Sequence, residues 1–78
     1  MSQSKAIQND YVFDNRHVLP TGDLKLTVLR GDAWIFTEGC NFILRKGEQR
    51  ILSGTSKPAM IRRAFTRGFA QYQVEVVA

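Results

Sequence analysis

Six glycines recur at short intervals, and this spacing restricts the fold more than any other feature of the chain. They are Gly22, Gly31, Gly39, Gly47, Gly54 and Gly68. Glycine tolerates the positive backbone φ that tight turns need, and the runs between these glycines are rich in Val, Ile, Leu, Phe and Trp. Turns at this interval leave room for short strands only. The spacing therefore predicts an all-β domain without a helix of useful length.

Alternating side chains mark the strands between the turns. Leu24, Leu26 and Val28 are separated by polar residues, which is typical of a half-buried strand, and residues 69–77 show the same period. Residues 33–37 are apolar on both faces. We expect about six or seven strands in a small antiparallel barrel or sandwich. The side chains expected to be mostly buried are Leu26, Val28, Trp34, Phe36, Leu44, Leu52, Ile61, Tyr72, Val74 and Val76.

The organisation of the chain is simple. Residues 1–10 are polar and predict a flexible N-terminal tail, and residues 11–78 predict a single β-barrel domain. Cys40 is the only cysteine, so no disulfide can form within the chain, and this favours a reducing, cytoplasmic location. No apolar stretch is long enough to span a membrane, and a membrane role is not expected.

Positive charge is concentrated in one part of the sequence. The net charge is +4, and residues 45–67 carry seven Lys and Arg residues against Glu48 alone, so this segment is +6. Neighbouring Arg62 and Arg63 would point to opposite faces of a strand, which splits the charge. The segment predicts at most weak, sequence-nonspecific contact with the phosphates of a nucleic acid. The candidate anion contacts are Arg45, Lys46, Arg50, Lys57 and Arg67.

Residues for catalysis or metal binding are scarce. His17 is the only histidine, and it is far in sequence from Cys40. A metal site usually needs three or four His, Cys, Asp or Glu ligands, and a nucleophilic Cys–His pair needs a third, orienting group. We therefore expect no catalytic residue, no metal and no cofactor, and predict that the chain is not an enzyme. His17 is interpreted as an edge-strand residue and Cys40 as a turn residue.

One short string resembles a nucleic-acid motif. Residues 67–70 read RGFA, which matches the first four positions of the signature of RNA-recognition motifs. The next aromatic positions of that signature hold Gln71 and Val74 instead. That fold also stacks bases on several aromatic rings and needs two helices, which this sequence does not predict. We interpret the string as a chance match.

Three segments carry a family resemblance. Residues 31–39 read GDAWIFTEG, residues 42–48 read FILRKGE, and residues 60–64 read MIRRA. Together they resemble a small bacterial cupin-like family of uncharacterised function, over about residues 24–65. The sequence departs from this pattern by one inserted residue, Phe36. The resemblance implies a cupin-like β-barrel.

The resemblance does not extend to metal chemistry. Metal-binding cupins carry two histidines at a fixed distance after a glycine, and counting from Gly31 these positions hold Thr37 and Gly39. Neither residue can bind a metal as histidine does. The dioxygenase and isomerase activities of that superfamily are therefore not expected here.

A binding role is the function that the sequence favours. We expect a non-catalytic module for protein interaction or ligand sensing, and the alternative is the weak nucleic-acid binder described above. A chain of this size buries roughly 60% of its unfolded surface, which is marginal, and oligomerisation is a common remedy. In the two-faced strand 33–37, Ile35 either lies under another strand or joins a self-association surface. The second alternative predicts a homodimer formed through Trp34, Ile35 and Phe36.

Overall fold

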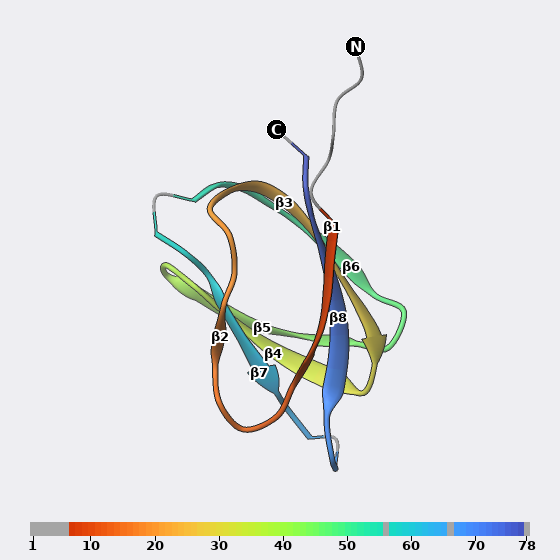
Figure 1. Cartoon of the computed structure of the whole chain (residues 1–78). Coiled ribbons are helices and arrows are strands. Elements are labelled where there is room, and N and C mark those ends of the chain that lie inside the picture. The colour runs from red at the N-terminus through yellow and green to blue at the C-terminus, as the bar shows by residue number, and fades with distance from the viewer. Residues whose placement is uncertain (1–6, 56, 66, 78) are drawn as a thin grey trace.

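Two antiparallel sheets make up the protein, packed face to face (Figure 1). The computed structural model describes residues 7–55, 57–65 and 67–77 of the chain. Within these residues the fold is all-β, as the sequence predicts, and it has eight strands instead of six or seven. The strands are β1 (Ile7–Val12), β2 (His17–Val18), β3 (Gly22–Arg30), β4 (Asp32–Thr37), β5 (Cys40–Arg45), β6 (Gln49–Thr55), β7 (Met60–Arg63) and β8 (Ala70–Val76).

Strands that are consecutive in sequence mostly lie in different sheets. Sheet A has the order β1-β8-β3-β6, and sheet B has the order β2-β7-β4-β5. Gly31, with φ of 71°, turns the chain between β3 and β4. In the sequence, Gly31-Asp32 stands between two apolar runs, which is a signal for a two-residue hairpin and predicts that these two strands pair. That prediction is wrong, because β3 pairs with β6 and β8 while β4 pairs with β5 and β7. A turn signal identifies a reversal of the chain but not the strand that will be its neighbour.

The N-terminal strand corrects the predicted tail. Residues 7–10 belong to β1, and β1 pairs with β8 from Ile7 opposite Glu75 to Val12 opposite Ala70. The side chains of Ile7, Gln8 and Asn9 are exposed and show no alternation of buried and exposed residues. The segment is held in the sheet by its backbone pairing with β8. Residues 1–6, which complete the predicted tail, lie outside the described residues.

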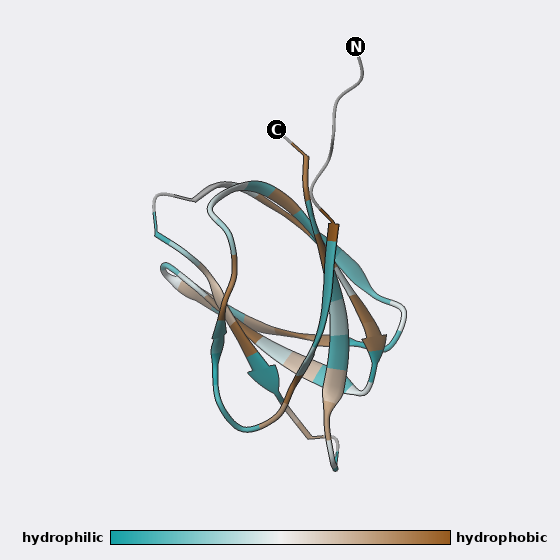
Figure 2. Ribbon diagram, in the orientation of Figure 1, coloured by the Kyte–Doolittle hydropathy of each residue, from teal (hydrophilic) through white to brown (hydrophobic). Residues whose placement is uncertain are grey.

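The core lies between the two sheets. Hydrophobic residues occur in the strands of both (Figure 2). Seven of the ten side chains expected in the core are buried, and Val76 is partly buried against it. The full set of buried side chains is Val12, Leu19, Leu24, Leu26, Val28, Ala33, Ile35, Leu44, Leu52, Ala59, Ile61, Ala70, Tyr72 and Val74.

Strand β4 has the opposite orientation from the one predicted. Ala33 and Ile35 are 0% exposed and face the core, whereas Trp34 and Phe36 are partly exposed on the outer face. Both faces of this strand are apolar, so alternation alone cannot tell which one is inside. Ile35 therefore lies in the core and cannot contribute to a self-association surface. Trp34 and Phe36 remain available for contact with a partner.

Candidate interaction surface

The outer face of sheet B carries two rows of large side chains. Strand pairing places Met60 between Val18 and Phe36 in one row. In the next row, Trp34 lies between Arg62 and Ile43. We call this surface, together with the side chain of Arg16 that reaches it, the aromatic–arginine face. Its residues are Arg16, Val18, Trp34, Phe36, Ile43, Met60 and Arg62.

The centre of the aromatic–arginine face is a stack of rings and guanidinium groups. The rings of Trp34 and Phe36 are 5.4 Å apart between centroids, and their planes differ by 20°. The Arg16 guanidinium lies 4.4 Å from the Phe36 centroid, and that of Arg62 lies 5.9 Å from the Trp34 centroid. A guanidinium stacked on a ring keeps its in-plane N–H groups, which can bind a carboxylate with two parallel hydrogen bonds. The stack can therefore hold arginines in position for an anion.

The outer face of sheet A is different in character. A polar row crosses all four of its strands, formed by Asn9, Gln73, Thr27 and Gln49. Hydrophobic side chains on this face include Ile7 and Ile51, which stand on the edge strands β1 and β6. Single exposed hydrophobic residues are common on protein surfaces, whereas a cluster of them marks an interaction site. Tyr11 on this face also contacts Phe69, with 4.9 Å between the ring centroids. Sheet B differs in that arginines lie over its outward-facing rings, and we therefore take it as the candidate binding side.

A pocket opens at one end of the aromatic–arginine face. Its volume is about 250 Å³, and it is lined by Phe36, Thr37, Glu38, Lys57, Pro58 and Met60. Three of these residues are hydrophobic. The Lys57 ammonium lies 4.0 Å from the Glu38 carboxylate, so two opposite charges stand together at the pocket. The pocket therefore offers an apolar lining with little net charge.

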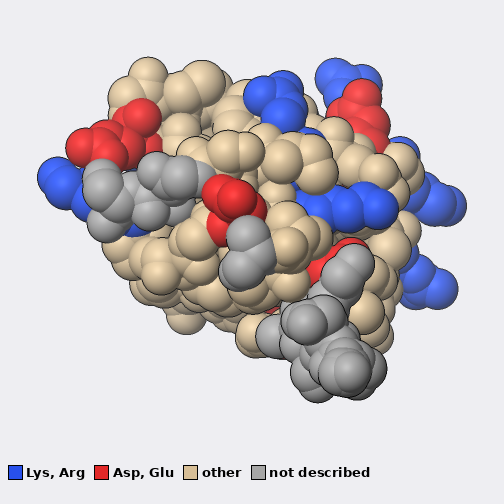
Figure 3. Space-filling view, turned by 90° about the horizontal axis from the view of Figure 1, so that it is seen from above, with Lys and Arg blue, Asp and Glu red and all other residues tan. Residues whose placement is uncertain are grey.

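The basic residues singled out in the sequence do not converge on one site. Arg45 and Lys46 lie where β5 turns toward β6, at the same end of sheet B as the start of the β7–β8 connection that carries Arg67. Lys57 lies at the opposite end, beside Glu38, and the Arg50 guanidinium lies 4.1 Å from the Phe42 centroid. Figure 3 shows most of the basic groups in the right half of the side that it presents, with uncharged and acidic groups between them, and further basic atoms at the left edge.

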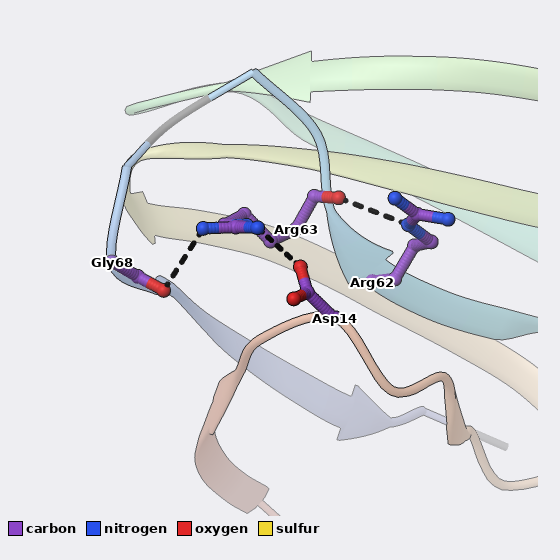
Figure 4. A network of polar contacts seen from close by, with 4 residues as sticks. All are labelled: Asp14, Arg62, Arg63 and Gly68. Atoms are coloured by element: carbon purple, nitrogen blue, oxygen red, sulfur yellow. Dashed lines mark hydrogen bonds and ion pairs between the residues drawn. The ribbon is translucent and has the colours of Figure 1, made fainter.

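Arg62 and Arg63 point to opposite faces, as the sequence predicts (Figure 4). Arg63 forms an ion pair with Asp14 and donates a hydrogen bond of 3.5 Å to the carbonyl of Gly68. Its Nε is buried without a hydrogen-bond partner. Arg62 uses its Nε to donate to the backbone carbonyl of Arg63, at 3.2 Å. Arg63 thus connects two loops of the fold, whereas Arg62 belongs to the aromatic–arginine face.

A second polar cluster lies between the sheets. His17 Nδ1 is 3.2 Å from the Tyr72 hydroxyl and 3.5 Å from Asp10 Oδ2. Burial, with a smaller contribution from the Asp10 charge, raises the pKa of Tyr72 to about 12. The sequence does not indicate this cluster, because the polar residues 1–10, which include Asp10, predict a tail. Asp10 and Val12 are two residues apart, so their side chains lie on the same, inward face of β1. This spacing is the signal that could have indicated the cluster.

The positions that hold histidines in metal-binding cupins form part of a turn here. Thr37 donates a hydrogen bond of 2.7 Å to the backbone carbonyl of Cys40, and Gly39 has φ of 84° in the β4–β5 turn. Cys40 is exposed. Among the described residues, no group of three or more His, Cys, Asp or Glu side chains is placed to hold a metal ion. Nor does the described part of the chain contain a helix that could cross a membrane.

Comparison with known structures supports the cupin-like fold. A cupin-2 domain protein from Shewanella frigidimarina superimposes with a TM-score of 0.71 and 12% identity, over 100% of this chain and 74% of that one. A protein of unknown function from Vibrio parahaemolyticus superimposes with a TM-score of 0.72 and 12% identity, over 99% of this chain and 81% of that one. A protein from Neisseria meningitidis superimposes with a TM-score of 0.69 and 16% identity, over 99% of this chain and 79% of that one.

These comparisons define a class of fold and nothing finer. The chain has the fold of small cupin-like domains, as its sequence resemblance implies. No protein-family model matches the sequence, and the comparison with curated proteins gives no significant match. At identities this low, similarity of fold does not transfer a function.

Proposed function

We propose that this chain is a non-catalytic protein-interaction module of the cytoplasm, which binds an acidic protein partner through the aromatic–arginine face. The observation that carries this proposal is the concentration of Trp34, Phe36, Met60 and two arginines that lie over the rings on the outer face of one sheet. Aromatic residues, Met and Arg are the types enriched in the buried centres of protein–protein interfaces.

The electrostatics favour an acidic partner over a second copy of the chain. A symmetric dimer through this face would bring the same patch of both copies together, including Arg16 and Arg62. Like charges placed opposite each other oppose association, whereas carboxylates of a different protein would pair with these guanidinium groups. A homodimer is therefore the less favoured occupant of this surface.

The ring geometry disfavours single-stranded nucleic acid. Proteins that bind it without sequence preference stack successive bases on open aromatic faces. Here the facing sides of Trp34 and Phe36 are used in their own stack, and Arg16 covers Phe36 as well. The guanidinium groups over the rings can still donate hydrogen bonds, which fits carboxylates flanked by apolar side chains.

Ligand sensing is also less favoured. Pockets for small molecules usually have volumes of about 300 to 1,000 Å³. The pocket beside Phe36 and Met60 has about 250 Å³, which is better suited to a side chain of a partner.

Site-directed cross-linking tests the proposal. A photo-reactive residue, benzoylphenylalanine, is introduced at Ile43 on the aromatic–arginine face or at Thr27 on the outer face of sheet A. We expect a protein to be cross-linked from position 43 and not from position 27. The captured protein, once purified, should bind the unmodified chain, and Arg62→Glu should weaken binding by roughly tenfold or more. Lys25→Glu, the matched charge reversal on sheet A, should leave binding unchanged.

Three results would overturn the proposal. One is equal capture from the two positions, and another is binding that Arg62→Glu does not affect. The third is that something other than an acidic protein binds the aromatic–arginine face. This would be a second copy of the chain, if sedimentation shows a dimer that Trp34→Ala abolishes, or RNA, if Trp34→Ala abolishes the binding of an oligonucleotide.

A further inference from the structure

We infer that the partner contributes an extended segment with an apolar side chain and, two residues away, a carboxylate. The apolar side chain enters the pocket beside Phe36 and Met60, and the carboxylate binds Arg62. This inference rests on the proposed function and specifies the chemistry of the partner that the aromatic–arginine face accepts.

The pocket selects an apolar group. Its lining includes Phe36, Pro58 and Met60, and its two opposite charges, Lys57 and Glu38, are 4.0 Å apart. A carboxylate entering here would approach Glu38 and gain little from a lysine that already has a partner. Burial of an aliphatic or aromatic side chain is favourable through the hydrophobic effect. An apolar side chain is therefore the favoured occupant.

The arginine that receives the carboxylate stands one row farther along the sheet. Phe36 pairs with Met60 at the pocket, and Trp34 pairs with Arg62 in the next row. Two residues of a strand span about 6.5 to 7 Å, and an extended partner segment repeats its side chains at the same interval. Phe36 and Met60 form the edge of the pocket nearest to Arg62. An apolar residue seated against these two side chains therefore places the residue two positions away beside Arg62, on the same side of the segment.

Arg62 is prepared for this contact by its surroundings. Its guanidinium is held near the Trp34 ring, and its Nε donates to the carbonyl of Arg63. These contacts limit the conformations of a long side chain, so less entropy is lost when a carboxylate binds. The remaining terminal nitrogens can donate to a carboxylate.

Synthetic peptides test the spacing directly. The probe is a short Ser/Gly peptide with one Phe and one Glu two residues apart, made with Phe first and with Glu first. Three control peptides replace Phe by Ala, replace Glu by Lys, or put Phe and Glu next to each other. Trp34 is the only tryptophan, so its fluorescence reports binding at this face. We expect one of the two probe orders to bind at least fivefold more tightly than every control peptide.

A charge exchange supplies the decisive control. Arg62→Glu should abolish the preference for the Glu peptide and create a preference for the Lys peptide, because opposite charges then face each other again. Lys25→Glu should leave the order of affinities unchanged. Far-ultraviolet circular dichroism of each variant checks that it is folded.

The outcomes separate this inference from the proposed function. If acidic peptides bind equally well without Phe or with the wrong spacing, the inference is wrong and the acidic interaction surface remains. If no peptide changes Trp34 fluorescence, or if Arg62→Glu does not exchange the preference, the inference is also wrong. The proposed function is judged separately, by the cross-linked partner and its response to Arg62→Glu.

Discussion

The Tyr72 hydroxyl lies 3.2 Å from Nδ1 of His17, and this contact joins the two sheets. Tyr72 stands on β8 of sheet A, and His17 stands on β2, a two-residue edge strand of sheet B. Asp10 on β1 adds its carboxylate to the cluster, 3.5 Å from the same nitrogen. The hydroxyl thus links β2, which pairs with β7 in sheet B, to sheet A.

The first prediction concerns this hydroxyl at high pH. Burial raises the pKa of Tyr72 from 10.0 to about 12. Above pH 10 the unfolded chain releases this proton while the folded chain retains it, so stability falls as pH rises and the contribution is lost by about pH 12. Between about pH 9 and about pH 11, we expect the free energy of unfolding to fall by about 1 kcal/mol less in Tyr72→Phe than in the wild type. The measurement is urea unfolding of both proteins at about pH 9 and about pH 11.

Tyr11 and the other titrating groups are common to both proteins and cancel in this comparison. A parallel loss of stability in the wild type and in Tyr72→Phe would contradict the assignment.

The second prediction concerns the orientation of β4. Ile35 is 0% exposed, so Ile35→Ala should lower the free energy of unfolding by about 2 to 5 kcal/mol. Trp34 is partly exposed, and its ring contacts Phe36 and Arg62 on the outer face. Trp34→Ala should cost only about 1 kcal/mol, the order of one aromatic pair. Urea unfolding followed by circular dichroism measures both, and a larger loss for Trp34→Ala would show that the faces are reversed.

How far the sequence predicts the fold depends on the contrast between the two faces of each strand. In β3 and β8 polar residues separate the hydrophobic ones, and Leu26, Val28, Tyr72 and Val74 are buried as expected. In β4 both faces are hydrophobic, so the pattern contains no information on orientation. The larger side chains, Trp34 and Phe36, lie on the outer face, and the core holds Ala33 and Ile35.

The candidate site was harder to predict because it is formed by strand pairing. Arg62 meets Trp34 only because β7 lies beside β4, and Arg16 reaches Phe36 from the loop before β2. Turn signals do not specify such neighbours. Counting basic residues along the sequence selected Arg50 and Lys57, which the fold places beside Phe42 and Glu38 respectively. The arginines at the aromatic rings were not among the candidate anion contacts.

The third prediction contrasts two adjacent arginines. Arg63 joins Asp14 and the Gly68 carbonyl, so Arg63→Ala should lower the free energy of unfolding by about 1 kcal/mol. Arg62→Ala should change stability by less than about half of that, because its ring contact is partly exposed. Thermal unfolding of the two variants checks this order. Equal losses would mean that Arg62 has a structural role as well.

The fourth prediction concerns metal content. Thr37 and Gly39 stand at the positions of the cupin histidines, and His17 contacts Asp10 and Tyr72. Typical sites use three or four protein ligands, so we expect purified protein to contain no stoichiometric zinc, iron, nickel or manganese. Elemental analysis by mass spectrometry measures this. A stoichiometric metal that His17→Ala removes would contradict the prediction and point to the cluster at Tyr72.

The fifth prediction concerns nucleic acid. Arg45, Lys46 and Arg67 lie at one end of the fold and Lys57 at the other, so a single strand cannot contact all of them along one short groove. We expect weak binding of labelled single-stranded RNA and duplex DNA at low salt, without preference for sequence. Because such binding releases counterions from phosphates, it should fall steeply as salt is raised. Fluorescence anisotropy at two salt concentrations measures it, with Lys46→Glu as the variant at the basic end and Lys25→Glu as its matched control. Tight binding that persists at high salt and distinguishes sequences would require direct contacts to bases, and it would contradict this prediction.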